Sequence, residues 1–291
     1  MAVVGHVEWV EFARVERAPA SGEIAHSTAT WEEVGGGGAV SAVQLAKLAG
    51  DCLFLTVLGD DDLGRRCLRE ISGRGVDVRA ELRGRQRRAL TFIEPSGERT
   101  ITTLGEKLSP RGADPLPWNE LARCDAVYFV AGDAEALRAA RAARVLVVTM
   151  RDLGRLAGAR VALDAVIGSG RDRAERYPAG GIVPPPGLVV TTEGAAGGSY
   201  AAADGRSGRW EPAPLPGPVA DAYGAGDSFA AGLTMGLGEG MTADDAVALA
   251  ARCGAACMTG RGPYEGQLRQ LNGPPRSRPR ERAAARDRPM P

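Results

Sequence analysis

Short apolar segments alternate with stretches of helical periodicity along most of the chain. Strand candidates span Leu53 to Leu58, Ala126 to Val130, Val145 to Thr149 and Leu188 to Thr192. Between the first two, residues Asp62 to Gly73 place apolar side chains on one face of a predicted helix. Apolar strands that alternate with helices indicate a mostly parallel sheet covered on both faces. The sequence therefore predicts an α/β fold, and 291 residues suffice for one domain with a large core.

Two regions, residues 8–34 and 90–104, interrupt this alternation. In the second, Thr91 to Ile93 and Thr100 to Thr103 flank the turn Pro95-Ser96-Gly97. β-Branched and aromatic residues on both sides of a Pro/Gly turn predict a β-hairpin.

The C-terminal residues 272–291 are rich in Arg and Pro and have almost no apolar side chains to bury. We expect this tail to be disordered and the folded domain to span residues 1–271. Contact of its arginines with nucleic acid or an acidic partner is an alternative, but a solvated tail without function is favoured.

Charge and cysteine usage exclude several classes of protein. The chain has 36 basic and 36 acidic residues, so no overall field favours nucleic acid or a membrane surface. Its five cysteines show no disulfide or metal-binding spacing, which favours a reducing compartment. We find neither a signal peptide nor an apolar run of the ~20 residues that cross a bilayer. We therefore expect a soluble, cytoplasmic protein.

The run from Asp221 to Phe229 (DAYGAGDSF) carries the strongest functional signal. Apolar side chains at helical spacing begin at Phe229, so Gly224, Ala225 and Gly226 should lie at a helix N-terminus. Unpaired amides and the helix dipole favour an anion there. Asp227 would lie beside this anion hole as a general base. Alternatively, Asp227 is only a first-turn helix carboxylate and the glycines only shape a turn.

This run resembles the second signature of the ribokinase-like, or PfkB, carbohydrate kinases, with Ala222 in place of Thr. Three further segments are similar to that family in the same order: the glycine-rich run at 35–43, Val57 to Gly64, and the nucleotide segment at 192–197. The resemblance extends from about Val3 to about Leu268. It implies a central sheet flanked by helices, with residues 8–34 and 90–104 forming a small β-sheet lid that is often shared across a homodimer.

The resemblance also implies transfer of a phosphoryl group from ATP, with Mg²⁺, to a sugar-like alcohol. Asp227 would be the general base. Nucleotide would lie against Thr192, Gly194 and Gly197, whereas Glu8, Gly36 and Gly37 would contact the acceptor. Main-chain oxygens near the catalytic loop and Gly262 bind a monovalent cation in that family, so K⁺ is a candidate cofactor.

Departures from the family pattern limit what can be said of the acceptor. Glu8 and Val10 replace an Asn and an Asp that often bind sugar hydroxyls, and Val40 replaces another Asn. Ser169 and Asp172 are the nearest equivalents of the usual Asn-x-x-Glu, so Asp172 is only a weak metal-ligand candidate, and a surface loop charge is an equal alternative. Trp9 and Trp31 either contact the acceptor or pack within the lid.

Two further functions remain open. The protein could be a nucleoside kinase, or a catalytically silent regulator that binds sugar or nucleotide on the same fold. Loss of the Asn-x-x-Glu pattern motivates the second alternative, and retention of Asp227 argues against it.

Overall fold

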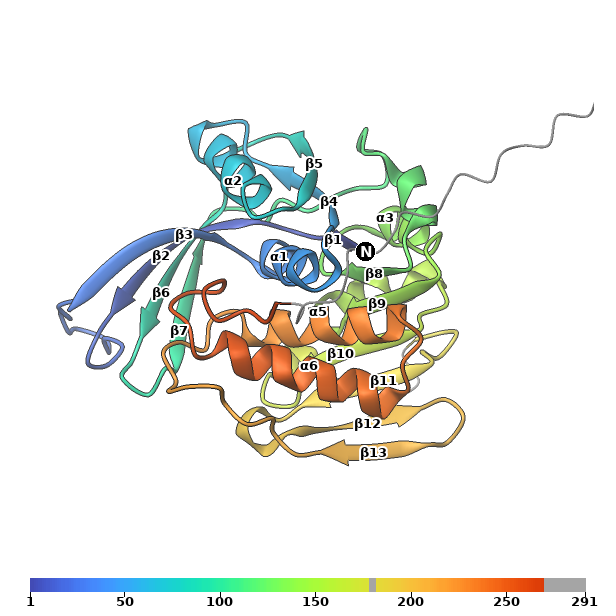
Figure 1. Ribbon diagram of the computed structural model, residues 1–291. Coiled ribbons are helices and arrows are strands. Elements are labelled where there is room, and N and C mark those ends of the chain that lie inside the picture. Colours follow the sequence, from blue (N-terminus) through green and yellow to red (C-terminus); the bar gives the residue numbers. More distant parts are fainter. Residues whose placement is uncertain (178–181, 270–291) are drawn as a thin grey trace, which may run out of the picture.

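A computed structural model describes residues 1–177 and 182–269 of the chain. The predicted tail at 272–291 lies outside these residues. Within them, nine strands form the main sheet (Figure 1): β1 (Ala2–Val4), β4 (Leu53–Leu58), β5 (Asp77–Leu82), β8 (Ala126–Phe129), β9 (Val145–Thr149), β10 (Ala165–Ser169), β11 (Leu188–Thr192), β12 (Gly198–Ala202) and β13 (Ser207–Trp210). Their order is β13-β12-β11-β10-β9-β8-β1-β4-β5.

Neighbouring strands from β11 to β5 pair in parallel, and β12 and β13 add an antiparallel edge. The sequence prediction matches the ends of β4, β9 and β11, and β8 ends one residue earlier than expected. In a parallel sheet all carboxyl ends lie along one edge, where ligands bind in open α/β folds. This edge therefore brings together the residues that follow β1, β8, β9, β10 and β11.

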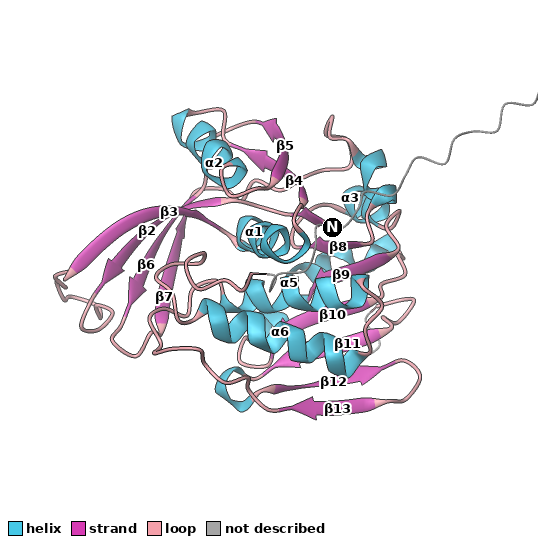
Figure 2. Ribbon diagram, viewed as in Figure 1, coloured by secondary structure: helices cyan, strands magenta, loops and turns pink. Residues whose placement is uncertain are grey.

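Helices cover both faces of the main sheet (Figure 2). One core contains buried residues of α1 (Gly37–Ala49), α2 (Asp62–Ser72), α5 (Ala225–Gly238) and α6 (Ala243–Cys257). The opposite core contains residues of α3 (Ala134–Ala140) and α4 (Leu153–Leu156). Short 3₁₀ turns lie at Trp118–Arg123, Met150–Asp152, Ala157–Ala159, Arg173–Glu175 and Gly194–Ala196. The result is the three-layer arrangement predicted from the alternation of elements.

Local sequence explains where the helices begin and how closely they pack. Asp61 caps α2 because its carboxylate accepts a hydrogen bond from the Gly64 amide at 2.8 Å. Gly232 allows α5 and α6 to pack closely, since any side chain there would place its Cβ only 2.8 Å from the Ala250 Cα. No helix in the described ranges is long and apolar enough to cross a membrane.

The two regions that interrupt the alternation form a second sheet, which we call the side sheet. It comprises β2 (Glu8–Arg14), β3 (Ala29–Gly35), β6 (Arg88–Ile93) and β7 (Arg99–Leu104) in the order β3-β2-β6-β7. The predicted hairpin is present as β6–β7, and Gly97 takes a φ of 82° in its turn. In Figure 1 the side sheet extends from the main sheet beside α1 and the start of α5.

Candidate active site

The N-terminus of α5 is open, as an anion site requires. Gly224 precedes the helix with a φ of 81°, a left-handed conformation that favours glycine. No described side chain caps the helix, and first-turn amides have no partner within an α-helix. Gly226 is exposed, and a Cβ built on it would have no heavy atom within 4 Å. Gly226 therefore borders free space, whereas the Ala225 amide already donates to Ala222 O at 3.4 Å.

Asp227 lies in the first turn of α5 and is partly buried. Desolvation raises the pKa of this carboxyl to about 6, with Arg99 and Arg151 opposing the shift and Glu175 and Glu8 adding to it. A general base whose pKa lies near the working pH is both ionised and able to accept a proton. The environment of Asp227 therefore suits general-base catalysis.

The predicted acceptor residues lie against the start of α5. A Cβ on Gly37 would be 2.9 Å from Asp227 Oδ1, so a larger residue at 37 would collide with the carboxylate. Gly36 has a φ of 87°, and its Cβ would lie 2.9 Å from the Glu8 amide nitrogen. Glycine is thus favoured at 36 by its positive φ and the adjacent backbone, and a side chain at 37 would have to displace the Asp227 carboxylate.

Glu8 begins β2 and is 7% exposed. Its Oε1 lies 3.2 Å from Arg87 Nε and 3.9 Å from His6 Nε2. Burial raises the pKa of Glu8, although Arg87 and Lys107 act in the opposite direction. Burial also lowers the pKa of His6, and Lys107 and Arg87 reinforce the effect, so this imidazole is neutral.

The predicted nucleotide residues form a turn at the carboxyl end of β11. Thr192 ends the strand and donates a hydrogen bond to Gly168 O at 3.4 Å. Gly194 and Gly197 have φ values of 64° and 74°, and a Cβ on Gly197 would lie 1.9 Å from Trp210 O. Trp210 stacks on Phe229 of α5 at 5.6 Å, so this turn is connected through packing to the helix that carries Asp227.

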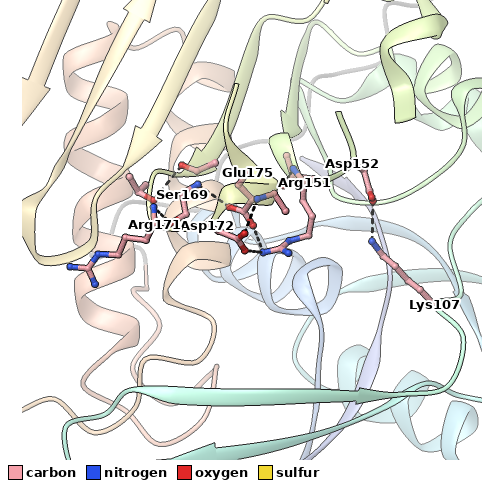
Figure 3. A network of polar contacts seen from close by, with 11 residues as sticks. Lys107, Arg151, Asp152, Ser169, Arg171, Asp172 and Glu175 are labelled. Carbon is pink, nitrogen blue, oxygen red and sulfur yellow. Dashed lines mark hydrogen bonds and ion pairs between the residues drawn. The ribbon is translucent and has the colours of Figure 1, made fainter. Parts of the chain in front are cut away.

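Asp172, the weak metal candidate, belongs to an ion-pair network at the ends of β9 and β10 (Figure 3). Its Oδ1 accepts from the Ala174 amide at 2.9 Å, and its Oδ2 lies 2.7 Å from Arg151. Arg151 also pairs with Glu175 Oε1 at 2.5 Å, while Glu175 Oε2 accepts from the Ser169 amide at 2.8 Å. Both carboxylates are engaged by one guanidinium.

Sequence reasoning missed Glu175 and Arg99 as charges that shift the pKa of Asp227. Glu175 had a signal, because it follows Asp172 by the same three positions that separate the Asn and Glu of the family pattern. Arg99 had none. It begins β7 in the side sheet, and only the fold lets its charge act on a residue that far along the chain.

Replacing Arg99 by Gln is expected to move the acid limb of the pH–rate profile to higher pH. Arg99 is the strongest charge that lowers the pKa of Asp227, so its removal raises that pKa and protonates this candidate base at higher pH. The measurement is kcat/KM against pH between about 5 and 8. Arg88→Gln, in the same sheet and paired with Glu11, should leave the limb in place. Equal profiles for Arg99→Gln and the wild type would contradict this assignment.

The described architecture matches those of known kinases. Similar solved structures include ribokinase from Thermotoga maritima, with 18% identity, a TM-score of 0.73, and coverage of 92% of this chain and 96% of that chain. Arabidopsis thaliana ribokinase, solved with ribose and ATP, has 19% identity, a TM-score of 0.71 and coverage of 91% and 94%. Adenosine kinase from Sinorhizobium meliloti has 20% identity, a TM-score of 0.72 and coverage of 90% and 94%. A comparison with curated proteins gave no match.

The covered parallel sheet with its small side sheet is thus a ribokinase-like fold. The model of the pfkB family of carbohydrate kinases matches residues 1–148 and 134–270. The chain belongs to this family, and the family and fold implied by the sequence resemblance are confirmed.

Proposed function

We propose that this protein phosphorylates a hydroxyl group of a sugar or sugar-like acceptor with ATP. The observation that carries the proposal is Asp227, a carboxyl with a pKa raised to about 6 at the open N-terminus of α5. Asp227 would accept the acceptor's hydroxyl proton while the amides of Gly224, Ala225 and Gly226 stabilise charge on the transferred phosphoryl group.

The remaining predicted residues divide between the two substrates. Thr192, Gly194 and Gly197 would hold the nucleotide, and Glu8, Gly36 and Gly37 the acceptor. The side sheet would close over the acceptor and exclude water. Pairing of two chains through this sheet, and a K⁺ site near Asp221 and Gly262, remain predictions. The Asp221 carboxylate accepts hydrogen bonds from the Tyr223 and Gly262 amides, at 2.7 and 3.1 Å.

Magnesium would be held with help from the nucleotide rather than by protein groups alone. In the described part of the chain, no three His, Cys, Asp or Glu side chains are grouped to hold a metal ion. Mg²⁺ in kinases usually takes one or two carboxylates together with substrate phosphates and water. Asp172 and Glu175 are the candidate carboxylates; both pair with Arg151, so binding the ion would require them to give up part of that pairing, and the ion would supply charge neutralisation at the phosphates.

The nucleoside alternative is less well supported by the contacts of Trp9. This side chain packs under Arg66 of α2, with 4.1 Å between the guanidinium and the ring, and its indole N–H donates to Glu32 at 3.2 Å. Trp31 stacks on Phe12 at 4.9 Å. Both tryptophans therefore have packing roles, so neither supports stacking on a nucleobase.

The test is to incubate the purified protein with ATP, Mg²⁺ and K⁺ and a panel of sugars, sugar phosphates, polyols and nucleosides. ADP release and the phosphorylated product are measured for each acceptor. Product formation with a sugar-like acceptor is expected. Turnover confined to nucleosides would favour the alternative kinase, and ATP binding without turnover on any acceptor would favour the silent regulator.

Glu175→Gln is expected to move the acid limb of the pH–rate profile to lower pH, opposite to Arg99→Gln. The charge of Glu175 raises the pKa of Asp227, so the neutral amide allows Asp227 to remain ionised at lower pH. Because Glu175 is also a candidate for the metal site, the Mg²⁺ concentration for half-maximal rate should rise. A profile that shifts upward, or does not shift, would contradict the electrostatic part of this prediction.

A further inference from the structure

A tyrosine inside the catalytic loop contacts the predicted acceptor turn. Tyr223 immediately precedes Gly224, and its Oη accepts a hydrogen bond from the Gly36 amide at 3.1 Å. Both residues are buried, although 187 positions separate them. A buried amide without a partner is costly, so this bond should be maintained in the folded protein. It directly joins the loop before α5 to the turn before α1.

The bonded amide belongs to the turn that lies next to Asp227. Gly36 precedes α1, and the following residue, Gly37, approaches Asp227 Oδ1 so closely that a Cβ there would be 2.9 Å from it. A Cβ on Gly35 would lie 2.7 Å from Tyr223 Oη, so the hydroxyl is packed against this turn. Displacing the phenol would thus change the position of Gly36 and Gly37 relative to the carboxylate.

The Tyr223 ring is also held by the side sheet and by its own loop. It meets Phe12 of β2 edge-on, with 5.1 Å between ring centroids, and Phe12 stacks on Trp31 of β3. The Tyr223 amide donates to Asp221 Oδ1 at 2.7 Å. Burial raises the pKa of the phenol, so the hydroxyl stays neutral. Its oxygen accepts the hydrogen bond from the Gly36 amide. These contacts hold the ring in place without help from Gly36, so its hydroxyl can fix the position of the Gly36 amide.

We propose that Tyr223 is a positioning residue, whose hydroxyl holds the acceptor turn at Gly36–Gly37 in register with Asp227. This role rests on the proposed kinase function, because it concerns the alignment of the acceptor hydroxyl with the general base. It assigns to the side sheet a part in catalysis, since Phe12 and Trp31 support the ring that sets this alignment. A small displacement of a bound reactant is enough to slow a reaction substantially.

The test compares Tyr223→Phe with Tyr264→Phe in the full-length protein. Tyr264 is equally buried, but its hydroxyl has no hydrogen-bond partner among the described residues, so it controls for loss of a buried phenol oxygen. Measured quantities are kcat, KM for the acceptor, KM for ATP, and Tm. For Tyr223→Phe we expect kcat/KM for the acceptor to fall about tenfold with KM for ATP unchanged. Tyr264→Phe should keep all kinetic values.

A second variant, Phe12→Leu, tests the same role without removing the hydroxyl. It loosens the ring of Tyr223 from the side sheet and should weaken acceptor turnover in the same direction, again without affecting ATP. The role of Tyr223 is overturned if Tyr223→Phe matches the wild type, or if acceptor and ATP parameters worsen together with Tm. A wild-type protein without turnover on any acceptor would instead overturn the proposed function and this role with it.

Discussion

Asp227→Asn is expected to reduce kcat by about 10²–10⁴-fold, the range that general-base catalysis supplies. Asn has nearly the same size and shape as Asp but cannot accept the proton of the attacking hydroxyl. The substitution leaves the proposed anion site at the start of α5 unchanged, so the dissociation constant for ATP should stay within a few-fold of the wild type. Turnover with the best acceptor and ATP binding by calorimetry are the measurements.

The stability of the Asp227→Asn variant distinguishes a catalytic role for Asp227 from a purely structural one. The folded-state pKa is raised above its unfolded value, so the folded protein carries a penalty for the charged form above pH 6. Asn removes that penalty, and Tm at pH 7.5 should be equal or higher. The difference should shrink as the pH falls towards 4, where Asp227 becomes protonated in the folded state.

Asp62→Asn is the matched control for Asp227→Asn. Asp62 occupies the first turn of α2, just as Asp227 does in α5, and pairs on the surface with Arg65. If Asp227 served only the helix dipole, both variants would lose a few tenths of a kcal/mol of stability and no activity. Full turnover by Asp227→Asn would exclude general-base catalysis by this residue.

Local sequence was sufficient to predict four of the nine strands described in the main sheet. Segments such as Leu53–Leu58 and Val145–Thr149 are mostly apolar because both of their faces are covered, and their length separates them from helices. The β6–β7 hairpin was also predictable from its turn residues. The pairing of β2 with β6 was not, because these strands join in parallel across more than 70 residues of chain.

The candidate site shows the same division between local and distant information. Asp227 and the Gly224–Gly226 turn could be proposed from sequence because the candidate base and the candidate anion hole are adjacent in the chain. Arg99 and Tyr223 act through contacts that depend on the side sheet, and nothing in their flanking residues indicates a partner. Glu175 had a spacing signal, but the turn that brings its carboxylate to the Ser169 amide could not be predicted from that spacing.

Gly226→Ala is expected to reduce turnover by about 10²-fold or more while leaving stability unchanged or higher. A Cβ at this position meets no protein atom within 4 Å, so the fold can accept a methyl group. Ala also favours the helical conformation over Gly by up to about 1 kcal/mol. The methyl group would, however, occupy open space at the first turn where we propose that the phosphoryl group binds, and we expect an effect of the size that disruption of an anion hole produces, about 10²–10³-fold.

Gly154→Ala provides the control, because Gly154 is also a helical glycine with open space at its Cβ position, in α4. Both variants should gain or keep Tm, but only Gly226→Ala should lose turnover and bind ATP more weakly. Destabilising substitutions usually reduce activity through loss of folded protein. An inactive Gly226→Ala with undiminished Tm would therefore indicate that the methyl group blocks the place where the phosphoryl group binds. A fully active Gly226→Ala would show that the transferred phosphoryl group does not occupy this space, even if Asp227 proves essential.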